Sequence, residues 1–112
     1  MFGVPRAVIR GKGGKQMLFY ISGKITDCPN HKNIFRAAEE TLKEHGHKVI
    51  NPAKVGETLK ALKYEEMMTI DFALIDLADA VLMLPNYKDS LGALREYGYA
   101  MSKNKIIWEV GK

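Results

Sequence analysis

The feature that most constrains the fold is the segment of residues 17–22, Met-Leu-Phe-Tyr-Ile-Ser, which is apolar until its last position. A strand that carries apolar side chains on both faces must be covered on both faces, as a central strand of a parallel sheet is. Gly23 follows at its carboxyl end. The segment therefore predicts a central, buried, parallel strand.

The rest of the chain alternates short apolar runs with helical patterns. We predict strands at 48–50, 80–84 and 106–108, helices at 30–44, 64–78 and 90–102, and a helical turn or loop at 54–63. Strands that alternate with helices imply right-handed crossovers. The sequence therefore predicts a single-domain, three-layer α/β fold. Its Rossmann-like or flavodoxin-like parallel sheet has four to five strands, with helices on both faces.

The chain length fits one domain, and the basic charge excess lies in the N-terminal residues that precede it. The 112 residues fit one domain, and we place it at residues 17–112. Residues 1–16 contain four basic residues and no acid, which accounts for the whole net charge of +4. We expect a flexible basic tail here, either vector-derived or preceding an alternative start at Met17. Because the remaining residues balance to zero, nucleic acid is a disfavoured partner.

Composition also limits the cellular setting. No apolar run approaches the roughly 18 residues of a membrane span, and the N-terminus lacks the apolar core of a signal peptide. Cys28 is the one cysteine, so no intrachain disulfide can form. We expect a cytoplasmic protein with no membrane partner.

The segment 90–102 has the pattern of a capped helix. Ser90 is a good N-cap, and Leu91, Leu94, Gly98 and Met101 recur at helical spacing. We predict that these four residues form the buried stripe of this helix.

Glu96 lies off that predicted stripe. Its side chain should lean back over Gly92 and Ala93, which are small and lie near the free N–H groups at the helix start. The alternative is a solvated glutamate on an ordinary helix, since most helix glutamates are surface residues.

The helix at 64–78 contains a second carboxylate of interest, Asp71. Its predicted apolar stripe is Met67, Ile70, Leu74 and either Leu77 or Ala78. Asp71 borders that stripe, and burying an unpaired carboxylate costs several kcal/mol, so a partner or a function is expected. The alternative is an edge aspartate bonded to a neighbouring backbone group or to a tyrosine hydroxyl.

Ligands of open α/β sheets bind outside the carboxyl ends of the strands, where the strand order reverses. This edge would gather residues 20–23, the Asn51 loop and the loop at 86–90. Two acids near one such cleft suit cleavage of glycosidic bonds, where one attacks or stabilises the sugar cation and the other handles a proton.

Several motifs together resemble the nucleoside 2-deoxyribosyltransferase-like superfamily. They are Tyr-Ile-Ser-Gly-Lys-Ile-Thr at 20–26, Gly-His-Lys-Val-Ile-Asn-Pro-Ala at 46–53, Asp71 with Leu74 and Asp79, Leu-Pro-Asn at 84–86, and Asp-Ser-Leu-Gly-Ala at 89–93 with Glu96. The resemblance spans about residues 17–110. It is nearest to a small family of uncharacterised function that is common in bacterial viruses and their hosts.

The resemblance implies roles for individual residues. Glu96 would be the nucleophile at the anomeric carbon, Asp71 would assist, and Tyr20 would lie beside the reacting pair. Ser90 would help to bind a 5′-phosphate, and Tyr87 stands where relatives often carry tryptophan. From this resemblance and from the strand-edge argument above, the residues expected to bind substrate are Ser22, Gly23, Asn51, Asp89, Ser90 and Gly92.

The expected function follows from the resemblance. It is a nucleoside or nucleotide N-glycosidase, or a 2-deoxyribosyltransferase, that needs no cofactor and no metal. Relatives often complete each site with a neighbouring subunit, so a homodimer or larger assembly with shared sites is expected. The alternatives are a noncatalytic module that binds a nucleotide-like ligand and a structural protein that kept the fold.

A zinc site is the remaining alternative from the sequence. Cys28 and His31 have a possible first-pair spacing, but His45 and His47 flank the helix stop at Gly46 and lack the usual second-pair spacing. We therefore predict no metal site.

Overall fold

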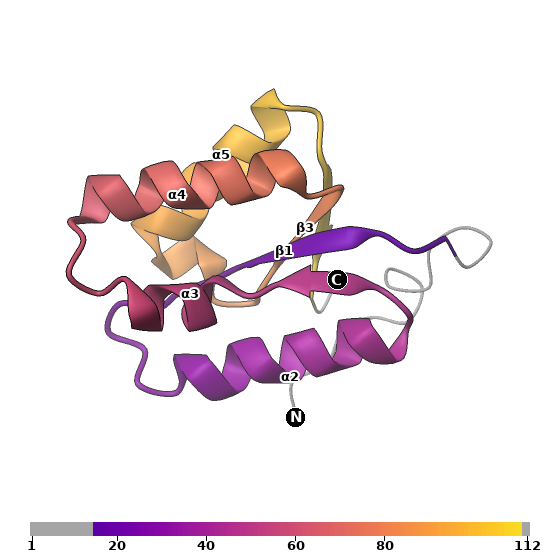
Figure 1. The fold of residues 1–112 in the computed structure, drawn as a ribbon, viewed down its shortest axis with the longest axis horizontal. Coiled ribbons are helices and arrows are strands. Elements are labelled where there is room, and N and C mark those ends of the chain that lie inside the picture. The colour runs from indigo at the N-terminus through magenta and orange to yellow at the C-terminus, as the bar shows by residue number, and fades with distance from the viewer. Residues whose placement is uncertain (1–14, 111–112) are drawn as a thin grey trace.

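The computed structural model describes residues 15–110, which form a single α/β domain (Figure 1). The strands are β1 (Leu18–Ser22), β2 (Lys48–Ile50), β3 (Ala80–Met83) and β4 (Ile106–Glu109), and the helices are α2 (His31–Glu44), α3 (Pro52–Thr58), α4 (Tyr64–Leu77), the short 3-10 helix η1 (Tyr87–Asp89) and α5 (Leu91–Ser102). All strand pairs are parallel, and the order is β2-β1-β3-β4. The predicted fold class is confirmed, with four strands.

The central strand β1 explains the layers. Its side chains alternate between the two faces of the sheet. Phe19 and Ile21 pack with Phe35 and Leu42 of α2, whereas Tyr20 packs with residues of α4 and α5 that include Ile75. Figure 1 shows α2 and α3 on one side of the sheet and α4 and α5 on the other. Burial on both faces follows directly from the apolar run at residues 17–22.

The strand order reverses between β1 and β3, because β1 connects to β2 on one side and pairs with β3 on the other. Such a switch point is where ligands bind in sheets of this type. The residues that follow β1 and β3 therefore belong to the most promising edge of the sheet.

Helix α3 covers the first half of the stretch at 54–63, for which the sequence predicted a helical turn or loop, and residues 59–63 are turn or irregular. Pro52 stands at its first turn, and Asn51 caps it by accepting a hydrogen bond from the Ala53 N–H at 3.0 Å. The predicted stop of α2 at Gly46 is also confirmed, since Gly46 adopts a φ of 87°. Asn30, at the start of the helix predicted at 30–44, makes no side-chain capping bond to α2.

The predicted stripe of α5 is wrong. Leu91, Leu94 and Met101 are 69%, 44% and 57% exposed, and Gly98 is exposed too. The buried residues are Ala93, Glu96 and Ala100. Small alanines let the helix approach the sheet closely, and Glu96 can be buried because the sheet supplies hydrogen-bond donors for it. The helix is thus turned away from the face that leucine spacing alone favours.

The stripe predicted for α4 is only partly right. Met68 and Ile75 are its buried residues, and Ala78 just beyond it is buried as well. Leu77 is 70% exposed, whereas Met67, Ile70 and Leu74 are half-buried. The helix is rotated so that Met68 and Asp71 face the open end of the sheet.

The two remaining sequence expectations are the basic tail and the lack of a membrane span. The predicted basic tail at 1–16 lies almost entirely outside residues 15–110. Within that described range, no helix combines the length and apolar character that a bilayer crossing requires.

Candidate active site

The site is built around Glu96, which α5 turns toward the sheet. Glu96 is only 7% exposed. Its Oε1 accepts a hydrogen bond from the Ser22 hydroxyl at 2.6 Å, and its Oε2 accepts one from the Tyr20 hydroxyl at 3.0 Å. Tyr20 and Ser22 lie two positions apart on β1, so both point to the same face of the sheet. One strand therefore delivers both donors to one carboxylate.

Asp71 comes to the same place from α4. Its Oδ1 is buried and accepts no hydrogen bond, the one such side-chain atom among residues 15–110. The carboxyl group nevertheless lies close enough to Tyr20 and Glu96 to act on their titration. An unsatisfied buried acceptor costs free energy, and a ligand that supplied a donor would remove that cost.

The two acids strongly affect each other's protonation. Burial, followed by the negative charge of Asp71, raises the pKa of Glu96 to about 8, against the opposing hydrogen bonds from Ser22 and Tyr20. Burial also raises the pKa of Asp71. Burial and the neighbouring carboxylates raise the pKa of Tyr20, so its hydroxyl stays a donor. Near neutral pH the pair therefore retains a proton.

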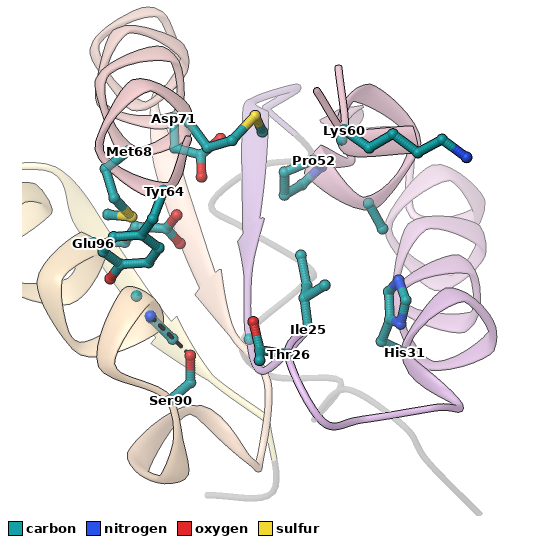
Figure 2. A pocket seen from close by; sticks show the side chains of 16 residues that line it. Ile25, Thr26, His31, Pro52, Lys60, Tyr64, Met68, Asp71, Ser90 and Glu96 are labelled. Atoms are coloured by element: carbon teal, nitrogen blue, oxygen red, sulfur yellow. Dashed lines mark hydrogen bonds between the residues drawn. The ribbon is translucent and has the colours of Figure 1, made fainter. Parts of the chain in front are cut away.

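Both acids open onto a pocket of about 320 Å³ at the switch-point edge (Figure 2). Such a volume falls in the range of small-molecule sites. Its lining residues are Gly23, Ile25, Thr26, His31, Pro52, Ala53, Gly56, Lys60, Tyr64, Met67, Met68, Asp71, Ser90, Gly92, Ala93 and Glu96. Figure 2 shows Asp71, Glu96, Tyr64 and Ser90 on one side of the pocket and His31 on the other.

The start of α5 forms one end of the pocket. The Ser90 hydroxyl accepts a hydrogen bond from the Ala93 N–H at 3.1 Å, which confirms Ser90 as the helix cap. A Cβ at Gly92 would lie 3.6 Å from the Tyr64 hydroxyl oxygen and 3.9 Å from the Ser90 Oγ. These are ordinary contact distances, so a side chain at position 92 would occupy space at the start of α5 that glycine leaves to the pocket.

Gly23 has a structural reason for its identity. A Cβ there would lie 2.6 Å from Cδ1 of Leu84, a distance that real contacts do not reach. Glycine thus lets the chain leave β1 directly beside the end of β3. Gly23 also lines the pocket, as the sequence predicted for a binding residue.

Three residues predicted for substrate binding, Ser22, Asn51 and Asp89, do not line this pocket. The Ser22 hydroxyl is bonded to Glu96 instead. Asp89 is exposed in η1. Asn51 holds the start of α3 and donates to Glu39 Oε1 at 3.0 Å, and it borders a different hollow of about 330 Å³ with Lys32, Arg36 and Lys54. Its side chain is engaged in linking α2 to α3.

Sequence reasoning missed most of the pocket wall, including His31, Lys60, Pro52 and Tyr64. One signal was present, because Tyr64, Met68 and Asp71 recur at spacings of four and three and therefore share one face of α4. Met67, which the sequence analysis placed in the apolar stripe of this helix, also lines the pocket, as does Met68. Among residues 15–110, no three His, Cys, Asp or Glu side chains are grouped to hold a metal ion.

Fold and site together define a small doubly wound α/β protein with a pair of carboxyl groups, the buried Glu96 and the half-buried Asp71, beside the β1–β3 switch point. The family described as "Domain of unknown function (DUF4406)" matches residues 17–109, so the chain belongs to this family. A search of curated proteins and a search of solved structures each found no match.

Proposed function

We propose that the protein acts at the anomeric carbon of a nucleoside or nucleotide, as an N-glycosidase or 2-deoxyribosyltransferase of the nucleoside 2-deoxyribosyltransferase-like superfamily. The observation that carries the proposal is the buried Glu96, held by Ser22 and Tyr20 beside the unsatisfied Asp71 in an open pocket. A carboxylate fixed by two donors has one orientation, and a nucleophile needs a fixed orientation.

The retained proton suits this chemistry. In the reactive form the proton lies on Asp71 and the negative charge on Glu96, which the Ser22 and Tyr20 hydroxyls stabilise. Glu96 forms a bond to the anomeric carbon while the bond from that carbon to the base nitrogen breaks, and Asp71 protonates the departing base. Water, or a second base, then attacks the same carbon and releases Glu96. The attacking water or base gives a proton to Asp71, which restores the starting state.

Ser90 and Gly92 would receive a 5′-phosphate at the start of α5. The 12-residue helix directs free N–H groups and its positive dipole end toward this part of the pocket. The carboxylate pair and the helix start would then hold the two ends of a sugar phosphate.

A shared site in a homodimer or larger assembly is part of the proposal. Leu91, Leu94 and Met101 form an exposed apolar stripe on α5, the helix that also carries Glu96. Leu91 and Leu94 flank Gly92 and Ala93, which line the pocket. A second copy covering this stripe would stand at the pocket rim. A cytoplasmic location is proposed from the single cysteine, Cys28.

A noncatalytic binding module is the second candidate, and one observation favours it. Because the carboxyl pair keeps a proton near neutral pH, it can both donate to and accept from the hydroxyls of a ribose without reacting.

The test is to incubate the protein with a panel of nucleosides and nucleotides and to measure released base by chromatography. Glu96→Gln should lower turnover at least about 100-fold, because a neutral amide cannot form the glycosyl ester. Asp71→Asn should lower it most for poor leaving bases. Glu39→Gln is the matched control, since Glu39 is a 6% exposed carboxylate outside the pocket. Saturable binding without base release would select the binding module.

A further inference from the structure

His31 has a fixed ring orientation and a fixed tautomer. Its Nδ1 lies 2.9 Å from the Cys28 carbonyl oxygen, which also accepts the His31 backbone N–H at 3.0 Å. A carbonyl only accepts, so Nδ1 carries the proton. The ring also packs edge-on against the buried Phe35, with 6.5 Å between ring centroids. With the proton on Nδ1, the Nε2 of this tautomer is an acceptor.

The wall around His31 differs from the wall that carries the acids. Figure 2 shows His31 across the pocket from Asp71 and Glu96. Its neighbours in the lining include Ile25, Pro52 and Ala53, all apolar. A flat, largely apolar group with a donor on its edge fits such a wall. A phosphate presents only acceptors and does not satisfy a neutral Nε2.

Lys60 does not reverse this assignment. It is the only Lys or Arg among the described residues that line the pocket. In Figure 2 its side chain extends away from Asp71 toward the outside of the pocket. The phosphate-compatible position inside the pocket is thus the start of α5 at Ser90, on the side of the acids.

We propose that His31 recognises the nucleobase. Its Nε2 accepts a hydrogen bond from an N–H or amino group on the base edge, so the base lies toward α2 and the phosphate toward the start of α5. The inference rests on the proposed nucleoside or nucleotide ligand, but it does not depend on cleavage of that ligand.

Calorimetry with two kinds of probe tests the inference. The four 2′-deoxynucleoside 5′-monophosphates contain a base, whereas 2-deoxyribose 5-phosphate does not. All variants carry Glu96→Gln, which prevents turnover. His31→Phe keeps a ring against Phe35 and removes both nitrogens. We expect it to weaken binding of the tightest nucleotide about five- to tenfold, the scale of one hydrogen bond, and to change the affinity for the sugar phosphate less than about twofold.

The chain offers a matched control in His45. Its Nδ1 lies 2.8 Å from the Thr41 carbonyl oxygen, the same kind of bond at the other end of α2, but His45 is exposed and outside the pocket. His45→Phe should change neither affinity. His31→Gln retains an acceptor oxygen and should recover part of the loss. If His31→Phe does not fold, His31→Gln tests the inference by the same comparison, the change in nucleotide affinity relative to the change in affinity for 2-deoxyribose 5-phosphate.

A modified ligand adds an independent arm. Methylating the edge N–H groups of the tightest nucleotide should weaken binding to native His31 and have no further effect in His31→Phe. Equal losses for nucleotide and sugar phosphate, or an unchanged nucleotide affinity, would overturn the inference alone. A protein that bound none of the four nucleotides but released base from a nucleoside would overturn the inference alone. A protein that bound none of them and released base from no compound of the panel would overturn the inference and the proposed function together.

Discussion

The Ser22 hydroxyl donates to Glu96 at 2.6 Å and joins β1 to α5 across 74 positions of sequence. The distance is within the range of O–H···O hydrogen bonds, and the bond favours the charged form of Glu96 against the burial that raises its pKa. With the bond from Tyr20, it explains how a side chain that is 7% exposed can remain an acid inside an apolar layer. Ser22 thus orients Glu96, although its own side chain is fully buried.

Ser22→Ala should shift the titration of Glu96. The Ser22 hydrogen bond lowers the pKa of Glu96, so its loss should raise that pKa further, by about one unit for a bond to a charged group. Turnover near pH 7 should fall about tenfold and recover partly at higher pH. A pH–rate profile measures this, with Ser102→Ala as an exposed control. A uniform loss at every pH would contradict a titration effect.

Glu96→Gln should become more stable relative to the native protein as pH rises. In the unfolded chain Glu96 ionises near 4.5, whereas in the fold its pKa is raised to about 8, chiefly by burial. Between these values the unfolded state releases a proton that the folded state keeps, so native stability falls as pH rises. The variant has no such proton. Its free energy of unfolding should gain at least about 1 kcal/mol on the native protein between pH 5 and pH 8.

Glu39→Gln provides the contrasting curve. Although burial opposes the shift, hydrogen bonds from Lys43, Asn51 and Lys54 lower the pKa of Glu39 to about 2. Its contribution is therefore complete above the unfolded value and is lost only as pH falls below it. Urea unfolding should show a constant difference from the native protein between pH 5 and pH 8. If Glu96→Gln gave an equally flat difference, its raised pKa would be refuted.

Ser90 can be tested for capping and phosphate binding separately. Ser90→Ala should cost about 1 kcal/mol of stability through the lost cap, and it should weaken 5′-phosphorylated ligands more than unphosphorylated ones. Ser90→Asp retains a capping oxygen but adds a negative charge. Ser90→Asp should therefore have nearly native thermal stability but should no longer bind 5′-phosphorylated ligands. Equal losses for both ligand types would assign Ser90 to the helix alone.

Leu94→Glu should dissociate an assembly that covers α5. Leu94 is 44% exposed in the single chain, so the substitution should leave monomer stability nearly unchanged. Sedimentation velocity should show a dimer or larger species for the native protein and a monomer for the variant. Leu77→Glu, at a 70% exposed position on α4, is the control. A native monomer that turned over substrate would rule out the shared site.

The sequence predicted the layers of the fold well, because they depend on local patterns, and it singled out Asp71 and Glu96 as the acids of interest. The apolar run at residues 17–22 required cover on both faces, and the structure places helices there. Asp71 was expected to be a conspicuous acid because it borders apolar positions, and its Oδ1 is indeed buried without a partner. Ser90 followed from capping chemistry alone.

The rotation of α5 could not be derived in the same way. Leucine spacing favoured Leu91 and Leu94 as core, but hydrogen bonds from Ser22 and Tyr20 make Glu96 the better buried residue. Those partners lie on a strand more than 70 positions away, so no local pattern records them. His31 was missed for a similar reason, since the pocket it lines is assembled from five separate segments of the chain.

Gly23 ties the fold to the pocket in a way that a library of variants would reveal. Because a Cβ at position 23 would collide with the buried Leu84, the two positions share one small volume. Functional sequences should accept alanine at 23 only together with a smaller residue at 84, whatever ligand the pocket holds. Intolerance at Gly23 would then report on chain folding, and only the residues facing the pocket would report on selection for chemistry.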